Sequence, residues 1–166
     1  MSTGKKQTEE FEGSEQQLAK RLSKHLKSGE AFMPVDELLK QMPFEDVGKN
    51  LEDIPYTIYE LVYHMRLAQL DIIRYCSDSE YEEPEWPEDY WPERSTPFDE
   101  EEWNNLLQKF IAERDEFREY IIKKPSHLFK EVQPDTGHTL LRQILLLIEH
   151  NAYHIGQLYV MNRLLP

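Results

Sequence analysis

The sequence predicts an all-α fold, a four-helix bundle. Four segments of roughly 15 to 26 residues place apolar side chains about 3.6 residues apart, so each segment has one face that needs burial. The chain is rich in Leu, Glu, Lys and Gln but holds only 6 glycines and 10 prolines, and this composition favours helices over strands. No segment has the pattern of a convincing strand. Four such helices can bury their apolar faces against one another in a bundle.

The length of 166 residues corresponds to one domain with short extensions. Residues 1–13 are polar and charged without apolar periodicity, so we expect a flexible N-terminal tail. Residues 14–166 then form the bundle. A chain of this size buries about two-thirds of its unfolded surface, so it needs neither a disulfide nor a structural metal to fold.

The first helix is expected from Ser14 to about Gly29, where leucines recur on one face. Prolines and a glycine then interrupt residues 32–56, which leave room for only one short helix at residues 35–42. The second helix has a clear start, because Thr57 and Glu60 form a capping box. Its apolar stripe continues to about Cys76.

The third helix follows a second long connection, residues 77–98, which carries four prolines and many carboxylates. Thr96 is expected as its N-cap and Pro97 as its first residue, and its stripe, which includes Arg114, ends near Lys123. The fourth helix is expected from Thr139 to Leu164. Its predicted buried positions are Leu140, Leu141, Ile144, Leu145, Leu147 and Ile148.

The net charge of the chain argues against some classes of binding partner. Nineteen Lys and Arg residues oppose 32 Asp and Glu residues, for a net charge of −13. This negative field repels phosphate groups and anionic lipids, so we expect binding to neither nucleic acid nor membrane. One cysteine, no signal-peptide pattern and no apolar run long enough to span a membrane indicate a cytoplasmic protein.

Three of the six histidines lie on helix faces that are otherwise apolar. His150 and His154 are one turn apart on the fourth helix, so their imidazoles can reach one cation. His64 is an inward-facing polar residue near the middle of the second helix. The three could form a metal site across two facing helices, or each could be a hydrogen-bonded core residue. His25 could add a fourth ligand, although a boundary position suits it better.

Other metal-binding and redox motifs do not match this sequence, because a required residue is missing or lies at the wrong spacing. The zincin pattern requires a glutamate directly after the first histidine, where this chain has Asn151. Ferritin-like di-iron sites use a glutamate and a histidine in a Glu-x-x-His pattern. In this chain Glu60 and His64 are one residue further apart than that pattern requires. Cys76 has no partner in a CxxC pattern.

The segments around these histidines resemble the DinB/YfiT-like superfamily of metalloproteins. His64 lies in YHMRLAQLDIIRY, and His150 and His154 lie in LLLIEHNAYHIGQLYVMNRLL, whose HxxxHxGQ pattern is the more specific part. The resemblance covers residues 14–165. It implies a bundle in up-down-down-up order with two long connections, often a homodimer, that binds a divalent metal through the three matching histidines.

Members of this family include thiol-dependent S-transferases and isomerases and metal-dependent hydrolases. The resemblance therefore implies a small-molecule substrate, such as a thiol, and leaves transfer and hydrolysis both open. Three imidazoles suit zinc or nickel, with iron or copper as alternatives. A different class of function, a non-catalytic metal-binding or interaction bundle, also fits the sequence.

Several residues near the histidines have two interpretations. Asp71 and Gln157 could each hydrogen-bond a ligand imidazole, or could serve ordinary surface packing. The aromatic and acidic residues 81–98 could form a lid over a substrate pocket, or could seal the core. Tyr153 is expected to pack, and Gly156 is expected to allow another helix to approach closely.

Overall fold

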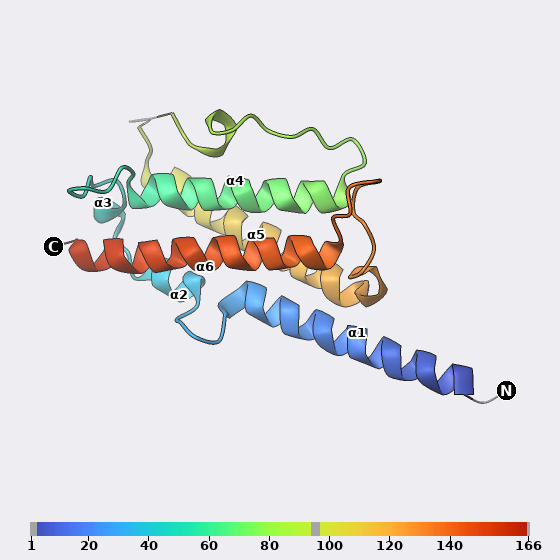
Figure 1. The fold of residues 1–166 in the computed structure, drawn as a ribbon. Coiled ribbons are helices and arrows are strands. Elements are labelled where there is room, and N and C mark those ends of the chain that lie inside the picture. Colours follow the sequence, from blue (N-terminus) through green and yellow to red (C-terminus); the bar gives the residue numbers. More distant parts are fainter. Residues whose placement is uncertain (1–2, 94–96, 166) are drawn as a thin grey trace.

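The structure, a computed structural model, describes residues 3–93 and 97–165, and it is all-helical as predicted. Four long helices make up most of it: α1 (Thr3–Ser28), α4 (Ile58–Ser77), α5 (Glu100–Lys123) and α6 (Leu140–Leu164) (Figure 1). Shorter elements lie in the connections, namely α2 (Val35–Lys40), α3 (Phe44–Val47) and the 3-10 turns η1 (Glu88–Tyr90) and η2 (Pro125–His127). Within the described residues there is no strand, only one isolated bridge between Glu131 and Thr139.

The four long helices bury their apolar faces on one another. Helices α4 and α6 lie side by side (Figure 1). Helix α4 also contacts α5, helix α6 also contacts α1, and α1 packs on α5. In Figure 1, α4 and α5 run in one direction and α1 and α6 run in the other, so the connection that follows α4 returns along the bundle before α5 begins. None of the helices in the described residues is long and apolar enough to cross a membrane.

The helix starts are set by side-chain caps. Thr57 and Glu60 form the predicted capping box of α4, and Thr139, where the fourth helix was expected to begin, is the N-cap of α6. The start of α5 differs from the prediction. Thr96 lies outside the described residues, and Asp99 is the N-cap, with Glu102 completing a second capping box. This box satisfies two backbone donors, which favours a start at Asp99.

Residues 3–13, which were expected to belong to a flexible tail, are helical in the structure. Helix α1 begins at Thr3, well before Ser14, and continues through Gly13. The segment is rich in Lys, Gln and Glu, which have high helix propensity, so it can extend a helix without an apolar face of its own. Figure 1 shows this end of α1 projecting past the other helices.

The buried face of α6 is narrower than predicted. Leu140, Ile144 and Leu147 are buried, but Leu141 and Ile148 are half-buried and Leu145 is 51% exposed. Helix α6 contacts α4 on one side and α1 on another. The remaining side, which carries Leu145, therefore stays at the surface.

Arg114 occupies the core face of α5, as the stripe predicted, and its side chain is only 1% exposed. Its guanidinium donates two hydrogen bonds, of 2.7 and 2.9 Å, to the carboxylate of Asp36 on α2. This bidentate pair attaches the short helix α2 to the bundle.

Candidate metal centre

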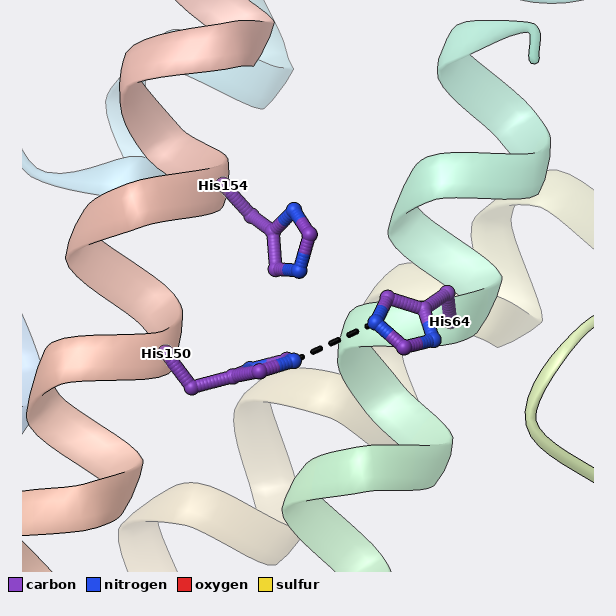
Figure 2. Close-up of side chains that lie close together, drawn as sticks. All are labelled: His64, His150 and His154. Atoms are coloured by element: carbon purple, nitrogen blue, oxygen red, sulfur yellow. Dashed lines mark hydrogen bonds between the residues drawn. The ribbon is translucent and has the colours of Figure 1, made fainter. Parts of the chain in front are cut away.

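The three histidines singled out by the sequence meet between α4 and α6. His64 is a buried residue of α4, and His150 and His154 are one turn apart on α6. Because these two helices lie side by side, the three rings converge on one point (Figure 2). One ligand atom from each ring lies within 4.8 Å of the others.

The spacing of the ring nitrogens suits a shared cation. Nε2 of His64 and Nε2 of His150 are 3.2 Å apart. Two histidine nitrogens on one tetrahedral zinc ion, each about 2.0–2.1 Å from it, are separated by about 3.3 Å. These two nitrogens, which share a hydrogen bond, therefore lie at about the separation that a shared zinc ion requires, and the ligand atom of His154 lies within 4.8 Å of them.

Hydrogen bonds at the other ring nitrogen orient two of the imidazoles. Nδ1 of His64 donates to the backbone carbonyl of Tyr90 over 3.3 Å, and Nδ1 of His154 donates to Oε1 of Gln157 over 2.6 Å. Each bond leaves Nε2 unprotonated and available as a ligand atom. Nδ1 of His150 is buried without a hydrogen-bond partner.

All three imidazoles favour the neutral form that binds metals. Burial, with the proximity of His154, lowers the pKa of His64 to about 4. Burial, with the proximity of His154 and His64, also lowers the pKa of His150 to about 4. Burial lowers the pKa of His154 as well. Near neutral pH the three rings thus carry no net charge.

The connection between α4 and α5 supplies an aromatic cover. The Trp91 ring stacks on His64 with the ring centroids 4.2 Å apart, and Trp86 presents an edge to His64 at 6.1 Å. Trp86 is 66% exposed, whereas Phe98 stacks on Tyr59 beside the core. Phe98 therefore helps to seal the core, as one interpretation of residues 81–98 expected, whereas the lid over a substrate pocket stays a prediction.

Of the two predicted supporting residues, only Gln157 contacts a histidine directly. Asp71 instead accepts hydrogen bonds from the hydroxyl groups of Tyr81 and Tyr90, at 2.7 and 2.8 Å. Its carboxylate thereby fixes the segment whose Tyr90 carbonyl holds His64. This carbonyl could not be predicted from the sequence, because a backbone group carries no residue identity.

The other residues considered near the site take different roles. His25 lies at the end of α1, outside the cluster, and His138 Nδ1 pairs with the Tyr75 hydroxyl. Tyr153 is 64% exposed, and its ring contacts His154. The close approach expected at Gly156 is not made by any described residue of this chain, since a Cβ there would meet no atom within 4 Å. The other alternative, an approach across a dimer, stays a prediction.

The structure is thus a helical bundle in which three histidines from two of its helices could hold a metal ion. The family model of the DinB superfamily matches residues 16–158, and the chain belongs to that superfamily. Neither the search of curated proteins nor the search of solved structures found a match.

Proposed function

We propose that this protein is a metal-dependent enzyme in which His64, His150 and His154 hold one divalent cation, and that its substrate is a small-molecule thiol. The observation that carries the proposal is the convergence of three neutral imidazoles at ligand spacing. Imidazole donors suit zinc and nickel, and also iron and copper. A cation held this way supplies Lewis acidity that lowers the pKa of a thiol or water bound to it.

The ligand set supports a catalytic centre over a structural one. In the part of the chain that the structure describes, no carboxylate or thiolate joins the three histidines. Structural zinc sites are usually closed by four protein ligands, whereas catalytic sites keep a position open for substrate. This difference favours an enzyme over a non-catalytic metal-binding bundle.

Two features favour a thiol over hydrolysis. No carboxylate of the described residues lies in the histidine cluster, where it could act as a general base for water. A thiol loses its proton more readily than water does, so it depends less on a general base. The chain's own Cys76 is buried, with the pKa of its thiol raised to about 12, so the reacting thiol would come from a separate molecule.

The first experiment is elemental analysis of the purified protein without an affinity tag. We expect about one divalent metal per chain in the unaltered protein and in His127→Ala, which changes a histidine outside the cluster. His150→Ala should lose the metal. Absence of metal from the unaltered protein, even after incubation with zinc and nickel, would leave a bundle with structural histidines.

The second experiment tests the reaction. The metal-loaded protein is assayed with glutathione or cysteine and 1-chloro-2,4-dinitrobenzene, in which sulfur replaces chloride. We expect metal-dependent turnover that His150→Ala abolishes. Metal-dependent cleavage of a nitrophenyl ester without any thiol transfer would assign hydrolysis instead.

A further inference from the structure

A groove lies beside the metal centre, between the segment that precedes α4 and the C-terminal half of α6. It measures about 370 Å³, which is within the range of small-molecule sites. Residues 53–56 line one side, and Tyr153, Gly156, Gln157 and Val160 line the other. The groove is open to solvent, because the side chains of Tyr153 and Val160 are 64% and 56% exposed.

The groove adjoins the metal centre through His154. The ring of Tyr153 contacts the ring of His154, with the centroids 4.9 Å apart, and Oε1 of Gln157 accepts the hydrogen bond from Nδ1 of His154. The ring of His154 points into the space that it shares with the other two histidines (Figure 2). On the opposite wall, Tyr56 stacks on Trp91, the ring that covers the histidine cluster. A molecule in the groove therefore lies close to a substrate bound at the metal centre.

Gly156 keeps the groove open. After proline, glycine is the least favourable residue inside a helix, and Gly156 lies well inside α6. Packing within the described part of the chain does not require a glycine there, because a Cβ at this position would meet no atom within 4 Å. The missing side chain thus leaves room for another molecule.

The groove disfavours anions. Asp53 is an exposed residue at its edge and is the one charged group among the lining residues, all of which the structure describes. Its carboxylate repels a negative charge, and the apolar walls cannot replace the hydration of one. Cysteine and glutathione both carry ionised carboxylates, so the reactant that meets the thiol suits the groove better than the thiol itself.

We propose that this groove binds the apolar body of the electrophile with which the thiol reacts, and that the part of the electrophile in the groove carries no negative charge. The role in thiol transfer rests on the function proposed above, whereas the binding of an apolar molecule does not. None of the three clustered histidines lines the groove, so protein with and without metal should bind the apolar group.

Two unreactive probes with the same ring test the groove. The first is 1,3-dinitrobenzene, which is uncharged and has no chloride to lose, and the second is 3,5-dinitrobenzoate, which adds a carboxylate. Binding is measured by titration calorimetry with the protein as purified and again after a chelator has removed the metal. We expect the uncharged probe to bind about fivefold more tightly than the anion in both samples. Equal affinities, or no binding of the uncharged probe up to its solubility limit, would overturn the proposal.

Two variants locate the binding. Gly156→Leu fills the groove from a position where a Cβ meets no atom, so the protein should fold and lose the uncharged probe. Ala112→Leu, at an exposed position of α5, introduces the same side chain and should bind normally. Asp53→Asn removes the charge and suits the φ of 65° at this residue, so the affinity of the anion should rise towards that of the uncharged probe. Undiminished binding in folded Gly156→Leu would place the probe elsewhere and refute the proposal.

Separate measurements distinguish failure of the groove from failure of the proposed function. Gly156→Leu should keep its metal, because residue 156 is not one of the three histidines, and should lose thiol transfer to 1-chloro-2,4-dinitrobenzene. Probe binding by a protein that holds no metal and transfers no thiol would support the groove and contradict the function. A second copy of the chain seated in the groove would exclude both probes, and Gly156→Leu would then lower the mass measured by light scattering, which would overturn the proposal.

Discussion

The backbone carbonyl of Tyr90 accepts a hydrogen bond from Nδ1 of His64. The hydroxyl group of the same tyrosine donates to Asp71, about two turns beyond His64 on α4. Tyr90 is therefore bonded to α4 at both ends, and its carbonyl position depends on Asp71. Because the bond at Nδ1 fixes the ring, Asp71 influences the proposed metal ligand without touching it.

Loosening Tyr90 should weaken metal binding. Tyr90→Phe removes the bond to Asp71 and leaves the ring, so we expect roughly a tenfold loss of zinc affinity, measured by competition with a chromophoric chelator. Tyr81→Phe is the matched control, because it removes the other hydrogen bond of Asp71 and does not contact His64. Equal losses in both variants would show that the effect is general destabilisation of the connection.

Gln157 should support His154 in the same way. Gln157→Leu removes the acceptor at Nδ1 of His154, and zinc affinity should fall about tenfold. Gln157→Glu keeps an acceptor and should retain the affinity. Gln108→Leu, at an exposed position of α5, is expected to leave it unchanged. A Gln157→Leu protein with full zinc affinity would contradict the orienting role.

The stability of the metal-free protein should fall in acid. The pKa of His64 and of His150 is about 4 in the folded chain, against an ordinary value of 6.5. Between these values the unfolded chain binds more protons, so the free energy of unfolding decreases as the pH falls from about 6.5 to 4. Each histidine contributes a slope of up to about 1.4 kcal/mol per pH unit.

Urea unfolding at a series of pH values measures this slope. The double variant His64→Gln and His150→Gln should give a flatter dependence between pH 6.5 and 4. His127→Gln, outside the cluster, is the control. A slope that the double variant leaves unchanged would mean that other groups cause the loss of stability.

The ion pair between Arg114 and Asp36 should be essential to stability. Asp36→Ala leaves the buried guanidinium with Asp115, at 3.2 Å, as its remaining ion-pair partner, so we expect a loss of up to about 3–5 kcal/mol, measured by urea unfolding. Adding Arg114→Met to Asp36→Ala should recover much of this loss, because it removes the buried charge that has lost its bidentate partner. For comparison, Glu119→Ala breaks an exposed pair with Lys123 and should have a much smaller effect.

Local sequence features predicted the helical elements well. The Thr57 and Glu60 capping box and the Thr139 cap are formed by neighbouring residues, so their geometry is encoded within a few positions. The start of α1 was misjudged because residues 3–13 carry no apolar periodicity, although their helix propensity is high. The exposure of Leu145 depends on which sides of α6 the neighbouring helices cover, which periodicity does not encode.

Local patterns of residues specify that this chain forms helices and that His150 and His154 share a helix face. The one-turn spacing of His150 and His154 required no tertiary information. Packing of the helices brings His64 to these two residues, places the Tyr90 carbonyl against His64 and pairs Arg114 with Asp36. These contacts join residues far apart in the chain, and they depend on how the helices and connections pack, which no local pattern specifies.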